Sequence, residues 1–280
     1  MEEGNGLSSN SWPIFQLDVK SSFLHGDLKE QVFVDQPSGY VKKGNEHKVC
    51  DKNKIVIVSL YVDDLIFTGS DVAMFNKFKE SMMIEFDMTD LGMLHYFLGI
   101  EIVQSTAGIF ISQKKYMQDI LNRFQMQNCN SVCIPTEVGM KLIKDHEGRK
   151  VDNTIYKQMV GSLMYLTATR PNIMHVVSLI SRFMECPKEI HLLAAKRILR
   201  YLKGTASYGL LYKKGGKTNL FGFTDSDYAG DPDDRKSTSG YAFKLGSGAV
   251  SWLSKKQPIV TLSTIEAEFA AATRCACQSF

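Results

Sequence analysis

IVIVSLYVDDLIFTG, residues 55–69, is the stretch that decides the fold of this chain. Two short apolar runs, rich in Val and Ile, flank two adjacent carboxylates, Asp63 and Asp64. Runs of this length and composition are typical of buried strands rather than of helices. We therefore expect a tight hairpin that carries the two acids at its tip.

The two acids need a compensating partner. Carboxylates beside buried strands repel each other and lose solvation. Mg²⁺ supplies such compensation, because it takes oxygen ligands from one or two carboxylates together with substrate phosphates. Asp-Asp is also a common composition of ordinary β-turns. The hairpin alone leaves both interpretations, metal site and plain turn, open.

Composition places the chain among globular proteins. With 280 residues, 44% of them hydrophobic and 22% charged, it is long enough for more than one domain. The sequence begins without a signal-peptide pattern, and its apolar runs are too short for a membrane span. We expect an intracellular protein without a membrane partner, cytoplasmic and nuclear placement being indistinguishable. The six cysteines lack CxxC or zinc-ligand spacing, which indicates reduced thiols.

Positive charge gathers in the C-terminal half. Residues 188–256 contain 13 Lys and Arg against 6 Asp and Glu, whereas residues 1–187 contain 19 against 22. A basic region suits a polyanionic partner, although solvated lysines on ordinary helices produce the same imbalance. Four basic side chains share one face of an expected helix over residues 191–203: Lys196, Arg197, Arg200 and Lys203.

Hydrophobic periodicity predicts an α+β fold. Strands are expected over residues 14–19, 32–37, 96–102, 108–111, 208–212, 220–225, 240–245 and 250–253. Helices are expected over residues 73–86, 116–124, 155–169, 173–184, 191–203 and 264–280. The first of these strands ends near Asp18, so a third carboxylate accompanies the hairpin acids.

Three blocks of sequence carry a family resemblance. FQLDVKSSFLHGDLKEQVFVDQPSGY (residues 15–40), SLYVDDLIFTGS (59–70) and DLGMLHYFLGIEI (90–102) resemble consecutive blocks of the copia-type long-terminal-repeat retrotransposon Pol polyprotein. Long blocks in the right order are far more specific than a single motif. The resemblance implies a partial reverse-transcriptase palm in which Asp18, Asp63 and Asp64 are the catalytic, metal-holding aspartates.

The implied chemistry is phosphoryl transfer on two Mg²⁺ ions, with template-primer and deoxynucleotides as substrates. Phe23 matches the aromatic position that excludes a ribose 2′-hydroxyl, plain core packing being its alternative. Tyr61, beside the hairpin acids, is the second substrate-binding residue that the resemblance implies. Residues 97–99 resemble the hairpin that holds the primer end.

A second resemblance covers the end of the chain. Residues 223–241, FTDSDYAGDPDDRKSTSGY, and residues 263–269, STIEAEF, resemble the start and the first helix of the family's ribonuclease H domain. Asp225 and Glu268 match two of its catalytic, Mg²⁺-holding acids, and Glu266 is the competing candidate for the second. An RNA/DNA hybrid is the implied substrate. Four further acids are expected to be turn and surface residues: Asp227, Asp231, Asp233 and Asp234.

The family layout implies four regions. Residues 1–13 form an unassigned leader, and residues 14–140 a reverse-transcriptase palm without its fingers and inter-motif segment. Residues 141–204 form a helical thumb and connection. Residues 205–280 form an incomplete ribonuclease H-like sheet with its first helix.

The chain departs from the family between its catalytic acids. Only 44 residues separate Asp18 from Asp63, and the SLYGLKQ-type block of the family is absent, with Cys50-Asp51 as the expected seam. Metal ligands without a nucleotide cleft should not polymerise, because positioning supplies much of the rate. The resemblance thus predicts an RNA-directed DNA polymerase with ribonuclease H by family, but an inactive chain. The alternative is a non-catalytic retroelement remnant that acts as an RNA- or DNA-binding or interaction module.

Overall fold

A computed structural model describes residues 12–19, 54–137, 139–215 and 219–278. The chain divides into two compact units, Met1–His95 and Tyr96–Phe280. Both combine antiparallel sheets with helices, so the α+β prediction is confirmed. No helix in the described ranges is long and apolar enough to cross a bilayer. The strand expected over residues 32–37 and the position of Phe23 lie outside the described residues.

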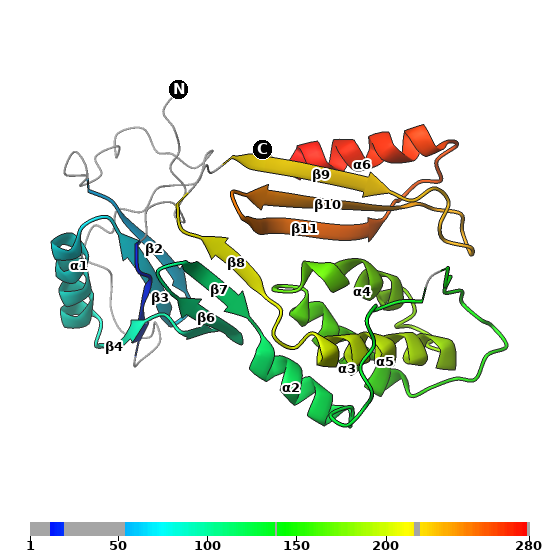
Figure 1. The fold of residues 1–280 in the computed structure, drawn as a ribbon, viewed down its shortest axis with the longest axis horizontal. Helices are drawn as coiled ribbons and strands as arrows, with labels where there is room; N and C mark the ends of the chain where they lie inside the picture. Colours follow the sequence, from blue (N-terminus) through cyan, green and yellow to red (C-terminus); the bar gives the residue numbers. More distant parts are fainter. Residues whose placement is uncertain (1–11, 20–53, 138, 216–218, 279–280) are drawn as a thin grey trace. The chain divides into compact units, whose positions relative to one another are not determined.

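Unit 1 is a four-stranded antiparallel sheet in the order β2-β3-β1-β4. Its strands are β1 (Phe15–Val19), β2 (Val56–Tyr61), β3 (Asp64–Gly69) and β4 (Met88–Met93). The expected hairpin is therefore confirmed as β2 and β3. Helix α1 (Val72–Glu85) follows β3 and packs against the sheet (Figure 1). The sequence pattern did not predict β4, whose segment MTDLGM lacks an apolar alternation.

The core of unit 1 lies between one face of this sheet and α1. Leu17 and Phe67 are fully buried there, and Phe75 of α1 packs against them. The Phe15 ring stacks on Phe67 and Phe75, with centroid distances of 5.7 and 5.1 Å. Because side chains alternate along a strand, the burial of Leu17 turns Asp18 to the opposite face.

Unit 2 begins with a second antiparallel sheet, ordered β5-β6-β7-β8. Its strands are β5 (Tyr96–Phe97), β6 (Ile100–Gln104), β7 (Gly108–Ser112) and β8 (Leu210–Lys213). The prediction of one strand over residues 96–102 is wrong. Leu98 and Gly99 adopt φ angles of +46° and +77°, which reverse the chain and split the segment into a hairpin.

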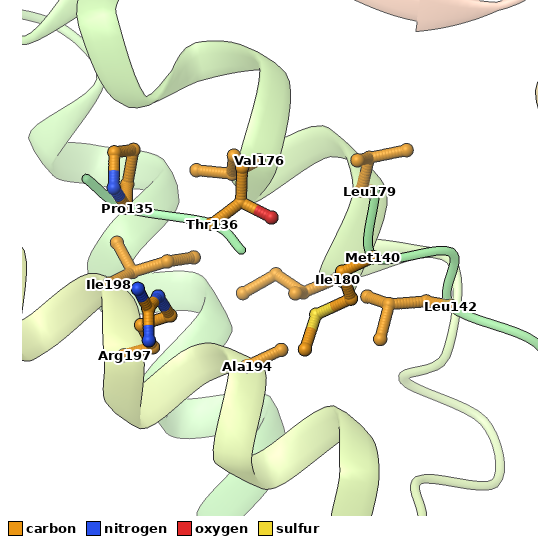
Figure 2. Close-up of a pocket in the computed structure, with 10 residues that line it drawn as sticks. All are labelled: Pro135, Thr136, Met140, Leu142, Val176, Leu179, Ile180, Ala194, Arg197 and Ile198. Carbon is orange, nitrogen blue, oxygen red and sulfur yellow. The ribbon is translucent and has the colours of Figure 1, made fainter. Parts of the chain in front are cut away.

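Helices form the middle of unit 2: α2 (Lys114–Arg123), α3 (Asn153–Leu166), α4 (Met174–Ser181) and α5 (Glu189–Gly204), with the short 3₁₀ helix η1 (Pro171–Ile173) before α4. Their apolar faces meet in one core around Tyr156, Leu163 and Leu199. A cavity of about 20 Å³ lies between α4, α5 and the segment that contains Pro135 and Met140 (Figure 2). It has room for about one water molecule, so the helices pack closely.

A three-stranded antiparallel sheet ends unit 2, in the order β11-β10-β9. It comprises β9 (Leu220–Ser226), β10 (Thr238–Leu245) and β11 (Gly248–Lys256). Helix α6 (Thr264–Gln278) packs on one face, over β9 and β10 (Figure 1). On the other face, the Trp252 indole nitrogen donates to the Thr167 carbonyl at 2.9 Å. Among the described strands, β9 has a neighbour on one side only.

Candidate functional site

Asp18 and Asp64 lie directly opposite each other on β1 and β3. The Val19 amide donates to the Asp63 carbonyl at 3.0 Å, so Val19 and Asp63 form a hydrogen-bonded pair. Antiparallel pairs alternate, which makes Asp18 and Asp64 a non-hydrogen-bonded pair with Cα atoms about 4.5 Å apart. Their side chains share one face of the sheet, and two like charges placed this way repel.

The hairpin tip is a strained two-residue turn. Tyr61 pairs with Asp64, so Val62 and Asp63 alone connect the strands. Val62 has a φ of +52°, a region that β-branched residues rarely adopt and that costs about 1–3 kcal/mol. Strain of this kind gathers at functional sites. The Asp63 Oδ1 atom is buried and has no hydrogen-bond partner among the described residues.

Gln16 is a member of this site that sequence reasoning missed. Its Nε2 donates to Asp64 Oδ1 at 2.6 Å, and the side chain is only 8% exposed. The available signal was alternation, because Gln16 precedes Asp18 by two residues and so shares its face. This neutral donor offsets part of the repulsion between Asp18 and Asp64.

The donor set suits Mg²⁺, which is held by one or two carboxylates and completes its shell with water and phosphate oxygens. Asp18 and Asp64 pair across the sheet, and Asp63 adds a buried oxygen that has no partner among the residues the structure describes. In the described part of the chain, however, no three His, Cys, Asp or Glu side chains gather closely enough to hold a metal ion. Tyr61 is 52% exposed beside the tip.

The two predicted nuclease acids both lie near the end of β9, but they approach it from different faces of the sheet. Asp225 lies opposite Gly240, and the amide of the next residue, Ser226, donates to Glu268 Oε1 at 3.4 Å. Ser226 packs toward α6, so alternation turns Asp225 to the other face. His175 of α4 is near enough to Asp225 for the two to interact electrostatically. Burial lowers the pKa of His175, while the negative charges of Asp227 and Asp225 oppose that shift. Glu268 thus reaches the strand beside Asp225 from the α6 side.

The competing acid, Glu266, lies in the first turn of helix α6. Its amide donates to Ser263 Oγ at 3.1 Å, and its carboxylate accepts from the Leu262 amide at 2.6 Å. Ser263 thus bonds the Glu266 amide as the serine of a capping box does, while the Glu266 carboxylate reaches the amide one residue before Ser263. The Glu266 carboxylate is therefore occupied at the helix start, whereas the Glu268 carboxylate lies at β9.

One of the acids expected on the surface is instead buried. Asp231 is 6% exposed and forms ion pairs with Arg182 at 3.2 Å and Lys256 at 2.6 Å. Burial by itself would raise the pKa of Asp231, but hydrogen bonds from Lys256 and from the Asp233 amide outweigh it and hold the pKa below its usual value. Asp227 is exposed, as predicted, and its carboxylate accepts from the Thr238 amide at 2.7 Å.

Three of the four basic side chains expected on one face of α5 have structural partners. Arg197 pairs with Glu137 at 2.8 Å. Arg200 donates to the Asn130 carbonyl at 2.8 Å, and Lys203 to the Cys129 carbonyl at 2.5 Å. They secure the segment that leads from α2 toward α3.

Comparisons with known proteins agree with the sequence resemblance. Residues 7–57 and 51–138 match the family described as reverse transcriptase (RNA-dependent DNA polymerase). The Pol polyproteins of transposon TNT 1-94 from Nicotiana tabacum and transposon RE1 from Arabidopsis thaliana are 38% and 37% identical over 92% of this chain. The chain spans only 23% and 20% of their lengths. An uncharacterized mitochondrial protein of Arabidopsis thaliana is 40% identical over 76% of the chain and 88% of its own length.

The alignments with the two Pol polyproteins are longer than the part of this chain that they cover. The two family matches overlap at residues 51–57, next to the expected seam at Cys50-Asp51. The alignment with the Nicotiana polyprotein runs over 310 positions but uses 92% of 280 residues, about 258, so about 52 positions have no counterpart here. Block order, identity and family match agree, and the chain belongs to the family of copia-type long-terminal-repeat retrotransposon Pol polyproteins, with part of their reverse transcriptase region.

Proposed function

We propose that unit 1 is the catalytic face of an RNA-directed DNA polymerase palm, in which Asp18, Asp63 and Asp64 hold two Mg²⁺ ions. The observation that carries this proposal is the direct pairing of Asp18 with Asp64 on the face opposite the core. A strained turn at the same hairpin tip adds support, as does a buried Asp63 oxygen without a hydrogen-bond partner in the described part of the chain.

The residues of this proposed site have distinct roles in binding metal and substrate. Asp18 and Asp64 present carboxylates from two strands, and Gln16 orients the Asp64 carboxylate. Bound Mg²⁺ would neutralise these acids and stabilise charge on the phosphates during nucleotide transfer. Tyr61 stands beside the acids, where it would contact a template-primer or a deoxynucleotide. Carboxylates from separate strands are needed because one strand end cannot surround a metal pair.

The polymerase of this chain is inactive in our proposal. The family block between the first and second acids has no counterpart here, and that block contributes nucleotide and template contacts. Positioning and electrostatic stabilisation provide most of the rate in phosphoryl transfer. The chain would therefore bind divalent metal at the palm without extending a primer.

Metal binding and primer extension test the two halves of this proposal separately. Mn²⁺ binding is measured on the wild type and on the Asp63→Asn/Asp64→Asn double variant, and primer extension is measured on poly(rA)·oligo(dT) with Mg²⁺. We expect Mn²⁺ binding at unit 1 that the double variant loses, and no extension by either protein. Equal binding by both proteins would overturn the metal site, and extension by the wild type alone would overturn the inactivity.

We further propose that the β9–β11 sheet and α6 are a partial ribonuclease H-like domain, and that α3, α4 and α5 correspond to the thumb and connection. Asp225 and Glu268 would hold Mg²⁺ and act on the RNA strand of an RNA/DNA hybrid. The position of Glu268 at the residue after Asp225 supports this pairing. Loss of Mn²⁺ binding in Asp225→Asn, in a protein whose unit 1 acids are already replaced, is the expected result.

The alternative is a non-catalytic module that binds RNA or DNA through its basic half. The α5 side chains give it little support, because Arg197, Arg200 and Lys203 already have partners. Binding to an RNA/DNA hybrid that weakens steeply with salt would favour this alternative. Affinity that ignores salt would count against a phosphate-contacting surface.

A further inference from the structure

Gln257 is a buried glutamine at the junction of β9, β10 and α6. It follows β11 directly and is 4% exposed. Its Nε2 lies 3.2 Å from Ser226 Oγ and 2.8 Å from Ser239 Oγ, on adjacent strands, and 3.0 Å from the Ala267 carbonyl of α6. One side chain thus links two strands and a helix.

The Ala267 carbonyl decides which way this amide points. A carbonyl only accepts hydrogen bonds, so the amide nitrogen of Gln257 and not its oxygen must face Ala267. The two N–H groups then serve three acceptors, so one N–H group is shared between two of them. The Oε1 atom of Gln257 is left buried without a hydrogen-bond partner among the described residues.

An unpaired buried amide oxygen is unfavourable, and an apolar side chain of similar size would fill the same space without it. Simple packing therefore does not account for a glutamine here. Two of the contacts of its nitrogen do, because Ser226 and Ala267 are each adjacent in sequence to a proposed nuclease acid, and the third contact, Ser239, pairs with Ser226 across the sheet. Ser226 follows Asp225, and Ala267 precedes Glu268.

The backbone of Gln257 is held as well. Its amide donates to the Ser237 carbonyl at 2.8 Å, just before β10 begins. The side chain therefore projects from a fixed point and sets the spacing between the end of β9 and the first turns of α6. That spacing controls whether Glu268 reaches the Ser226 amide, a contact of 3.4 Å.

We propose that Gln257 is a positioning residue that holds Glu268 beside Asp225. The inference rests on the proposed nuclease site, in which these two acids hold a divalent cation. Gln257 itself would touch neither the metal nor the substrate. Its effect passes through the Ala267 carbonyl and the Ser226 hydroxyl.

Amide hydrogen exchange at Ser226 tests this role without any metal. The Ser226 amide is protected by Glu268, so its exchange reports where that carboxylate lies. We expect Gln257→Leu to speed Ser226 exchange at least about tenfold relative to the β10 amides, approaching the rate in Glu268→Ala. Gln257→Asn, which is one methylene shorter and remains polar, should act in the same direction and covers the case in which the leucine variant fails to fold.

Gln113→Leu is the matched control. Gln113 is also a buried glutamine of unit 2 with an unpaired amide atom, and it accepts from Thr169 Oγ1 at 2.9 Å. This variant should leave the ratio of Ser226 to β10 exchange unchanged. If Gln257→Leu or Gln257→Asn speeds Ser226 exchange no more than that of the β10 amides, Gln257 contributes only stability and the proposal is overturned.

Broadening of the Ser226 amide signal by Mn²⁺ examines the nuclease site separately. We expect broadening in the wild type, none in Asp225→Asn, and at least about tenfold more Mn²⁺ for the same effect in Gln257→Leu, since misplaced ligands bind weakly. No broadening in the wild type would refute the nuclease proposal, while the exchange ratio would still decide whether Gln257 positions Glu268. Equal Mn²⁺ affinity in wild type and Gln257→Leu would count against positioning.

Discussion

Removing one charge from the Asp18–Asp64 pair should stabilise unit 1 in the absence of metal. The two carboxylates face each other across a non-hydrogen-bonded position, and no described cation pairs with either. Asp18→Asn keeps the size of the side chain and leaves the bond from Gln16 to Asp64 in place. Replacing the catalytic residue of a proposed polymerase would thus increase its free energy of unfolding.

The magnitude follows from Coulomb's law. Two charges about 5 Å apart repel by about 0.8 kcal/mol at the dielectric constant of water and by about 3 kcal/mol at an effective value of 20. Asp18 and Asp64 are both partly exposed, which places them between these limits. We expect Asp18→Asn to increase the free energy of unfolding of unit 1 by about 1–2 kcal/mol at low ionic strength.

Native-state amide exchange at Leu17 and Leu65 measures this change in unit 1 alone. Both residues lie in the core of the sheet, directly before and after the acid pair. Glu80→Gln, on the exposed face of α1, removes one charge from the same unit and serves as the control. The gain in Asp18→Asn should shrink at about 1 M salt, where the Debye length is about 3 Å.

Mg²⁺ should reverse the order of stability. The wild type gains free energy from binding the ion, whereas Asp18→Asn has lost a ligand. The reasoning would be refuted if Asp18→Asn were no more stable than Glu80→Gln without metal. A stabilisation that survives both high salt and Mg²⁺ would also refute it, because repulsion between the two acids could not then be the cause.

Three further predictions concern unit 2. Tyr156→Phe removes the 2.8 Å hydrogen bond to the Ile180 carbonyl, which still accepts from the Phe183 amide, and should cost about 0.5–1.5 kcal/mol in urea unfolding. Gly99→Ala should destabilise the chain by about 1–3 kcal/mol in the same assay, since φ is +77° and a Cβ would lie 2.8 Å from the Tyr165 hydroxyl. Adding Tyr165→Phe should not restore full stability, because the positive φ angle remains unfavourable for alanine. The pKa of Asp231 lies below 3.8 in the folded chain, so its ionised form contributes stability above pH 3.8, and this stability is lost as the pH falls through the lower folded pKa. The free energy of unfolding of Asp231→Asn, measured against pH, should lack this decrease at acid pH.

Local pattern alone identified the elements that carry the chemistry. The apolar runs around Asp63 and Asp64 predicted the hairpin, and alternation predicted a strand that ends at Asp18. Helices α1 and α2 followed from apolar spacing, because burial of one face depends only on neighbours three and four residues away. The family resemblance came from the same residues, and the comparisons confirmed it. The metal-holding roles of the acids stay predictions.

Other features needed backbone conformation or long-range contacts. The apolar pattern of residues 96–102 gave no sign of the reversal at Leu98 and Gly99, because hydrophobicity does not report φ angles; only the family resemblance of residues 97–99 indicated a hairpin there. The sequence indicated that Arg200 is a solvated or phosphate-binding cation, whereas in the structure it donates to the carbonyl of Asn130, 70 residues away in the chain. The sequence predicted that Asp231 is a surface turn residue, whereas in the structure it is buried in ion pairs with Arg182 and Lys256.

By itself the sequence determined the hairpin, most of the helices, the strand positions of the acids, and the family to which the chain belongs, but neither β4 nor the split between β5 and β6. Tertiary structure alone decided the register that sets Asp18 opposite Asp64, the bond from Gln16, and the junction at Gln257. The physical reason is that a period of two or 3.6 residues is a local property. The partner of a side chain across a sheet is chosen by the packing of segments that are distant in the chain.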